Sequence, residues 1–195
     1  MADLTPYIRA FQLQDGIRTL MRSFNTSHET LQGAAEEAED AWSKHERAIG
    51  DGPDAVGWTD GYAILTTTDL LKLRMVNAWA AASELRAAFI IALYHHWERC
   101  VYLWGDRRSS SHADHVRVMK GLGYPPDPDL EKVYRLASLL KHNSDRHGDR
   151  VWTLWREVFS PTFTCGPNAD WYGGLDLTDD HVNEVADIVG RSGPT

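Results

Sequence analysis

The chain of 195 residues contains little that would cross-link it or carry it across a membrane. Its two cysteines, Cys100 and Cys165, are too few for a disulfide framework, which is typical of a reducing compartment, so we predict a cytoplasmic protein. No run approaches the roughly 20 apolar residues that span a bilayer, since the best candidate, Ala87–Leu93, ends before His95. The first residues lack a basic stretch before an apolar core. We therefore expect neither a signal peptide nor a membrane partner.

The common sequence signatures of nucleotide-binding, hydrolase and metal sites are also missing. There is no P-loop, no GxGxxG and no GxSxG motif. His112 and His115 are three residues apart, but no cysteine or third histidine stands at metal-ligand spacing. The eight tryptophans are more typical of a core or an interface than of base-stacking platforms. We expect no metal and no cofactor.

Basic charge is scarce overall and is concentrated in one segment. The net charge of −8 argues against binding to nucleic acid of any sequence. Residues 107–156, however, carry 10 Lys/Arg against 6 Asp/Glu, a local charge of +4. Contact with RNA would therefore be confined to this segment. The alternative is that these charges belong to a solvated helix surface.

Helical periodicity dominates what is present. The longest pattern runs from about Asp69 to Trp104 without glycine or proline, which predicts one helix of about 50 Å. The alternative is a helix that is kinked at residues 80–84. Upstream we expect two helices, one opened by Thr5-Pro6 and one by a capping box at Thr26–Glu29. Downstream, capping and breaking residues predict helices over about 111–121, 129–143, 149–159 and from Thr178 onward.

These elements predict an all-α fold, a helical bundle around one long central helix with short loops. The glycine-, proline- and aromatic-rich residues 160–177 leave room for a small hairpin near the C-terminus. We expect a single domain over residues 1–195. Its parts would be peripheral N-terminal helices (1–62), a helical core (63–160), and a loop with the last helix (161–195).

The expected 129–143 helix carries a polar line beside its apolar side. Glu131, Arg135, Ser138 and His142 recur at steps of four, three and four residues. Histidine exchanges protons near neutral pH, and arginine binds phosphate with two parallel donors. RNA supplies its own nucleophile, the 2′-hydroxyl, so these groups suit metal-free cleavage. The alternative is a solvated face with a Glu131–Arg135 pair and a histidine near the helix end.

Two segments make the chain similar to a known superfamily. Residues 88–99 (AFIIALYHHWER) and 140–152 (LKHNSDRHGDRVW) resemble the HEPN-like helical-bundle proteins, many of which are metal-independent ribonucleases. The family carries an arginine, four to six residues and then a histidine. Arg135 and His142 are separated by six residues and match the looser spacing, whereas Leu136 departs from the polar residue that follows the arginine in the tighter pattern.

The resemblance implies roles for several residues. His142 would transfer protons, Arg135 would stabilise phosphate, and Glu98 on the partner helix would support them. Ser138, Lys141 and Asn143 are further supporting residues. Arg146 and Arg150 are alternative phosphate-binding residues if the turn after His142 folds back.

The resemblance also implies a function and partners. The chain would be a metal-independent endoribonuclease, a toxin or phage-defence component, working on RNA as a homodimer and regulated by an antitoxin or defence partner. The alternative is a non-catalytic HEPN-like module that acts through protein–protein contacts. A third interpretation is a small structural protein whose polar line is only solvated.

Overall fold

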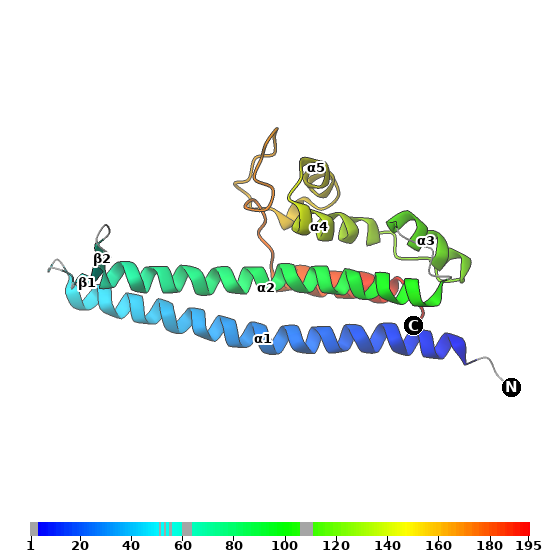
Figure 1. Cartoon of the computed structure of the whole chain (residues 1–195), viewed down its shortest axis with the longest axis horizontal. Coiled ribbons are helices and arrows are strands. Elements are labelled where there is room, and N and C mark those ends of the chain that lie inside the picture. Colours follow the sequence, from blue (N-terminus) through cyan, green and yellow to red (C-terminus); the bar gives the residue numbers. More distant parts are fainter. Residues whose placement is uncertain (1–3, 51, 53, 55, 60–63, 106–110) are drawn as a thin grey trace. The chain divides into compact units, whose positions relative to one another are not determined.

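Figure 1 shows a computed structural model that describes residues 4–50, 52, 54, 56–59, 64–105 and 111–195. Most of these residues are helical, and the prediction of an all-α helical bundle is confirmed. The elements, in chain order, are α1 (Thr5–Ile49), β1 (Val56–Thr59), β2 (Ile64–Thr66), α2 (Thr67–Trp104), α3 (His112–Gly121), α4 (Leu130–His142), α5 (Asp145–Leu154), a 3₁₀ turn (Arg156–Val158) and α6 (Asp179–Arg191).

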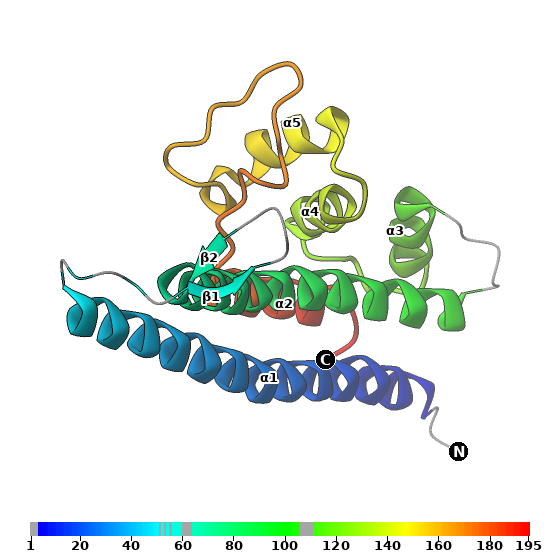
Figure 2. The ribbon, with the colours of Figure 1, turned by 60° about the vertical axis from the view of Figure 1, so that its left-hand side comes forward.

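The chain divides into two compact units, and the two long helices contribute to both. Unit 1 combines residues 1–24 with residues 86–195, and unit 2 is the continuous segment 25–85. In Figure 2, α1 is coloured blue to cyan and α2 green. The boundaries between the units fall inside both helices, so unit 1 contains the first part of α1 and the last part of α2, and unit 2 contains the rest of each helix.

The N-terminal residues form one helix where the sequence predicts two. α1 continues through the expected capping box without a break. The hydroxyl of Thr30 donates to the carbonyl oxygen of Thr26 at 3.0 Å, so this hydroxyl is satisfied within the helix. No glycine or proline stands at residues 24–32, so the capping residues alone do not end the helix. The prediction of a helix boundary at Thr26 is wrong.

The long central helix is present almost as predicted. α2 begins two residues before Asp69 and continues unbroken through residues 80–84. Its start is set by Thr66 and Asp69: the Asp69 carboxylate accepts from the Thr66 backbone N–H at 3.0 Å, and the Thr66 hydroxyl accepts from the Asp69 N–H at 3.1 Å. This is a reciprocal capping box.

α2 also has the length and composition of a membrane-spanning helix. Its most apolar 18-residue window has a mean hydropathy of 1.3, and 22% of that window is buried. Core helices of soluble proteins pass the same test, so this is weak evidence. The absence of a membrane partner stays a prediction.

Unit 2 is an antiparallel helix pair with a thin seam. The residues that turn inward alternate at steps of three and four, as in a coiled coil. Of the described side chains of this unit, only His28, Ala35 and Ala82 are buried. The seam residues are His28, Leu31, Ala35, Ala38, Trp42, His45 and Ile49 on α1, and Leu71, Met75, Ala78, Ala82 and Leu85 on α2.

The β-hairpin lies in unit 2 and not near the C-terminus. β1 and β2 pair antiparallel, with Thr59 opposite Ile64 and Val56 opposite Thr66. The expected hairpin region, residues 160–177, forms turns, and its end makes a single bridge between Phe159 and Leu175.

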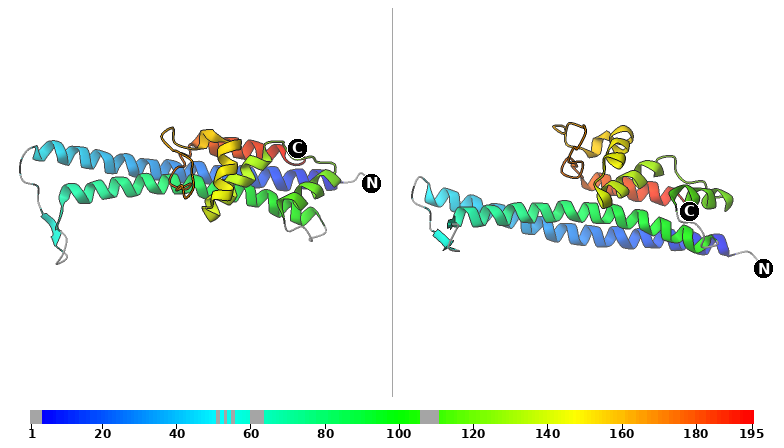
Figure 3. Two further views of the ribbon diagram at one scale, coloured as in Figure 1. Left: turned by 90° about the horizontal axis from the view of Figure 1, so that it is seen from above. Right: turned by 45° about the horizontal axis from the view of Figure 1, so that its top comes forward.

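Unit 1 holds the main core, which is built around α2. Trp97 is fully buried there, and its indole N–H donates to the Ser192 carbonyl oxygen at 2.8 Å. His96 lies 3.1 Å from the carbonyl oxygen of Leu13, which ties α2 to α1 within the unit. Figure 3 shows α2 and α6 as neighbours from two further directions. Other fully buried members are Leu13, Phe24, Ile90, Leu93, Tyr94, Met119, Leu130, Leu136, Leu139, Trp171 and Ile188.

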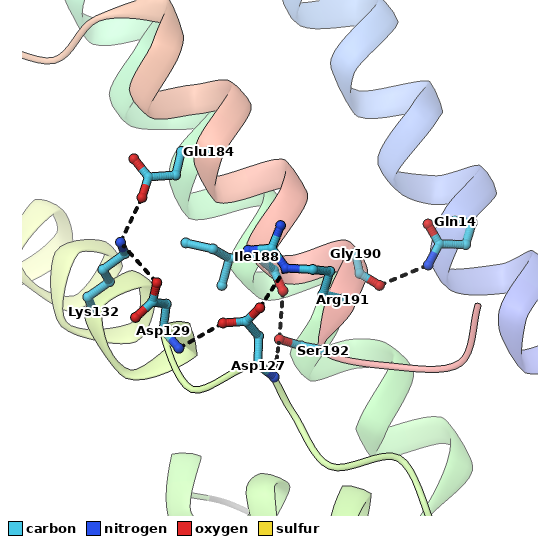
Figure 4. Close-up of polar contacts among 9 residues, drawn as sticks. All are labelled: Gln14, Asp127, Asp129, Lys132, Glu184, Ile188, Gly190, Arg191 and Ser192. Atoms are coloured by element: carbon cyan, nitrogen blue, oxygen red, sulfur yellow. Dashed lines mark hydrogen bonds and ion pairs between the residues drawn. The ribbon is translucent and has the colours of Figure 1, made fainter.

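A polar network closes the unit where α4 begins and α6 ends (Figure 4). The Arg191 guanidinium donates to Asp127 at 2.6 Å, and the Asp127 backbone N–H donates to the Ser192 hydroxyl at 3.2 Å. Lys132 binds Glu184 at 2.7 Å. These contacts fix α4 against α6, so α4 is a rigid support for the side chains that it presents.

Candidate functional site

The polar line of α4 does not form one exposed stripe. Glu131 and Arg135 are half-buried, Ser138 is buried, and only His142, at the end of the helix, is exposed. The reason is that α4 is covered on more than one side, since Leu136 is as fully buried as the expected core residues. Ser138 therefore lies inside the protein.

The ring of His112, on α3, contacts polar and aromatic side chains on two other helices. It stacks on Tyr134 of α4 with ring centroids 4.3 Å apart and an angle of 1° between the planes. Its Nδ1 lies 2.9 Å from the Tyr94 hydroxyl, and its Nε2 lies 3.2 Å from Oε2 of Glu131. Burial lowers the pKa of His112. The ring is therefore held by three residues from two helices.

The second carboxylate oxygen of Glu131 binds Arg135, one helical turn away. Nε of Arg135 donates to Oε1 at 2.7 Å, and Nη2 lies at the same distance from that oxygen. The guanidinium carbon also lies 4.8 Å from the centroid of the Tyr134 ring. The i,i+4 pair considered from the sequence is thus present, but it belongs to a larger cluster with His112 and Tyr134.

Glu98, on α2, lies next to this cluster. Its carboxylate is 2.7 Å from Nδ1 of His95 and 3.8 Å from Nδ1 of the buried His115. Burial, and then the negative charge of Glu98, raise the pKa of the Tyr94 hydroxyl far above its usual value. Lys141 lies 3.5 Å from Nε2 of His95. Glu98 and Lys141 are therefore linked through His95, and Tyr94 connects them to His112.

Two imidazole rings meet at the corner between α4 and α5. The ring centroids of His142 and His147 are 6.2 Å apart, and the His147 ring lies edge-on to Tyr134 at 6.5 Å. Burial lowers the pKa of His147, and nearby positive charges lower it further. These charges, in decreasing order of effect, are Arg135, His142, Arg146 and Lys141. The corner is thus a cationic spot that holds two histidines.

The residues that fix this corner come from the turn and from the segment after α5. Asn143 ends α4 in the left-handed conformation, with φ of 40°, and its side-chain oxygen accepts from the Tyr172 backbone N–H at 3.0 Å. The Trp171 indole donates to Asp145 at 2.8 Å and packs on Gly148. These contacts hold the start of α5, which begins at Asp145, four residues before the expected start.

The remaining predicted site residues lie at the surface of α5. Arg146 and Arg150 are exposed, and neither forms an ion pair or hydrogen bond with the residues that the structure describes. Arg146 lies near enough to His147 to lower its pKa. Of these two, Arg146 belongs to the cationic corner.

Charge separates the two units. Residues 25–85 carry 4 Lys/Arg against 11 Asp/Glu, a net charge of −7 out of the total of −8. Unit 1 is therefore close to neutral and contains the basic segment 107–156. Unit 2 would therefore repel a polyanionic ligand more strongly than unit 1.

Across the described part of the chain, no group of three or more His, Cys, Asp or Glu side chains is arranged to hold a metal ion. His95 and His115 both lie within 4 Å of Glu98, but Nε2 of His95 faces Lys141. The cluster is instead linked by hydrogen bonds and ring stacking.

Comparison of the chain with models of protein families, with curated proteins and with solved structures finds no match.

Sequence reasoning missed four members of the site: Tyr94, His112, Tyr134 and His147. Tyr94 and Tyr134 fit the apolar pattern of their helices, and His112 was considered only beside His115. The one available signal was the histidine content of the segments 94–96, 112–115 and 142–147, which contain six of the nine histidines.

Proposed function

We propose that the chain is a metal-independent endoribonuclease of the HEPN-like type that acts at the corner between α4 and α5. The observation that carries this proposal is the pair of imidazoles, His142 and His147, 6.2 Å apart beside Arg135. Two imidazoles and a fixed cation are the groups that metal-free cleavage of RNA requires.

The environments of the two rings suggest how they divide the reaction. Because its pKa is lowered, His147 is the neutral ring at pH 7 and takes the proton from the RNA 2′-hydroxyl. The 2′-oxygen attacks the adjacent phosphorus, and the bond to the 5′-oxygen breaks. His142, exposed at the end of α4, donates a proton to that leaving oxygen. The products are a 2′,3′-cyclic phosphate and a 5′-hydroxyl.

The cations of the corner would stabilise the phosphate during this reaction. Arg135 is the best held of them, because Glu131 and Tyr134 fix its guanidinium. Lys141 and Arg146 add positive charge nearby. The two residues proposed from the family spacing, Arg135 and His142, are kept in their roles, and His147 is added as the base.

The test is cleavage of RNA oligonucleotides in EDTA by wild-type protein and by His142→Ala and His147→Ala. Each variant should lose at least about 100-fold in rate, since general acid–base catalysis contributes about 10²–10⁴-fold. A matched control is His45→Ala, which removes a histidine of unit 2 that binds Asp54 at 2.9 Å. An oligonucleotide with a 2′-deoxy residue at the cleavage site should resist. Equal cleavage by all three variants would reject the proposal.

A second candidate function is a binding module that acts through protein–protein contacts, with a second copy of the chain as the simplest partner. Leu4, Ile8 and Phe11 are 62%, 55% and 63% exposed, and Tyr7 beside them is 73% exposed. At 100° per residue, the first three lie on the side of α1 opposite Leu13. Such spacing is typical of a helix that packs against another helix.

Light scattering after gel filtration tests this second function. Wild-type protein should be a dimer, and Ile8→Glu/Phe11→Glu should be a monomer that retains its helical circular dichroism. Leu73→Glu, which alters an exposed apolar residue of unit 2, is the matched control and should stay dimeric. A monomeric wild type at 100 µM would remove self-association from consideration.

A further inference from the structure

One edge of the Arg135 guanidinium is bound within the protein, and the other edge is not. Nε and Nη2 both contact Oε1 of Glu131. Nη1 has no hydrogen bond or ion pair to any residue that the structure describes. A guanidinium fixed along one edge presents the other in a defined direction, which suits recognition of a phosphate.

The residues that fix the guanidinium form a closed set. Glu131 joins Arg135 through Oε1 to His112 through Oε2, and both of these residues contact the Tyr134 ring. Each of these four residues contacts two of the other three, so moving any one of them would disturb two contacts of the set. Tyr94 adds the last link, since its hydroxyl lies 2.9 Å from the Nδ1 of His112 that faces away from Glu131.

From this geometry we propose that Tyr94, His112 and Glu131 are positioning residues, which aim the free edge of Arg135 at the phosphate of the substrate. The inference rests on the proposed ribonuclease function. It gives a positioning role to Glu131, and it assigns roles to Tyr94 and His112, which neither the family spacing nor the polar line of α4 selects. None of the three touches the substrate; they act only through Arg135.

The hydrogen-bond directions follow from the chemistry of the groups. Glu131 accepts from Arg135 as a carboxylate, so Nε2 of His112 must carry a proton to bind its second oxygen. In a neutral ring, Nδ1 is then an acceptor, and the Tyr94 hydroxyl donates to it. The chain of donors runs from Tyr94 through His112 to Glu131. Burial favours the neutral ring because it lowers the pKa of His112. The polar groups that influence this ring are Tyr94 and Glu98 on α2, His115 on α3, and Glu131 and Arg135 on α4.

Removing Glu131 should separate binding from catalysis. In Glu131→Gln the competing negative charge is gone, so phosphate should bind Arg135 at least as tightly as before. The guanidinium loses its charged acceptor and is held less firmly, so kcat should fall roughly tenfold or more while KM does not rise. A residue needed only for folding would lower the amount of active protein and leave KM and kcat per folded molecule unchanged.

Tyr94→Phe provides the second variant, since it removes one hydroxyl and keeps the ring. It should lower kcat by about threefold, and the double variant Tyr94→Phe/Glu131→Gln should be no slower than Glu131→Gln alone. This follows because the hydrogen bonds that join Tyr94 to Arg135 pass through His112 and Glu131, so the two effects share one hydrogen-bonded route. Tyr102→Phe, at an exposed position of the same helix, is the matched control and should leave kcat unchanged. Effects of Tyr94→Phe and Glu131→Gln that multiply would overturn the proposal.

A spectroscopic measurement on the full chain needs no activity. The Nε–H of Arg135 should give a resolved, slowly exchanging ¹⁵N signal at pH 7 that is lost in Glu131→Gln and weakened in Tyr94→Phe. Added inorganic phosphate should shift this signal in wild-type protein. If the signal behaves in this way but no RNA is cleaved, the positioning set stands and the ribonuclease proposal fails. A signal that is the same in wild type and Glu131→Gln would reject the positioning set, whether or not RNA is cleaved.

Discussion

Replacing Gly148 by alanine tests how the corner between α4 and α5 is held. A Cβ at this position would lie 2.5 Å from Cε2 of Trp171, and closer still to Cγ and Cδ2 of the same ring. Trp171 is 1% exposed, and its indole binds Asp145 at 2.8 Å, so the ring has no free space into which it could move. Either the ring leaves its site or α5 shifts away from it.

The cost follows from the two contacts that the substitution disturbs. Overpacking of a filled site costs about 1–3 kcal/mol. Loss of the indole hydrogen bond adds about 1 kcal/mol. The better helix propensity of alanine returns about 1 kcal/mol. We therefore expect the free energy of unfolding to fall by about 1–3 kcal/mol.

Urea unfolding followed by tryptophan fluorescence measures this change. The matched control is Gly33→Ala, since a Cβ at Gly33 in α1 would meet nothing within 4 Å. That substitution should leave the protein unchanged or stabilise it by up to about 1 kcal/mol. Because Gly148 follows His147, the proposed cleavage of RNA should also slow in Gly148→Ala. Stability equal to wild type in Gly148→Ala would refute the packing of Trp171 described above.

Two further predictions concern pH and the main core. Burial lowers the pKa values of His112, His147 and His181 in the folded state, so the unfolded chain binds more protons below about pH 6.5. The free energy of unfolding should therefore be highest above that pH and should fall toward pH 5. Urea midpoints that stay constant from pH 7.5 to 5 would contradict this. Trp97→Phe leaves the Ser192 carbonyl oxygen without its buried donor and should cost about 1–3 kcal/mol, measured by urea unfolding, whereas Trp104→Phe, whose indole binds Gln12 at an exposed position, should cost less than about 1 kcal/mol.

Most of the fold follows from local signals in the sequence. α2 could be predicted because its length contains no helix breaker, and α3 and α6 because Ser111 and Thr178 are capping residues with the expected geometry. The continuity of α1 could not be predicted in this way. The residues of a capping box can start a helix or lie within one. Burial of residues such as Ala35, which lies in the continuous helix, depends on tertiary packing and is not visible in local sequence.

The candidate site was only partly accessible from sequence for a related reason. The Glu131–Arg135 pair is a local contact between neighbours on one helix, and the i,i+4 rule finds it. The stack of His112 on Tyr134 joins two helices across a turn and depends on tertiary packing. His147 reaches the site because Asn143 turns the chain and Trp171 holds the start of α5, and these contacts link segments about 25–30 residues apart.

The thin seam of unit 2 has a consequence for how the protein fluctuates. Its two helices meet along a single line of side chains, and of its described side chains only three are buried, so few apolar contacts oppose local unfolding. Regions of this kind open at a free energy below that of global unfolding. Backbone amides of residues 25–49 and 67–85 should therefore exchange with deuterium earlier than those of α4 and α6. Unit 2 would behave as a separate cooperative unit, and a partner that covers its seam would reveal itself by slowing that exchange.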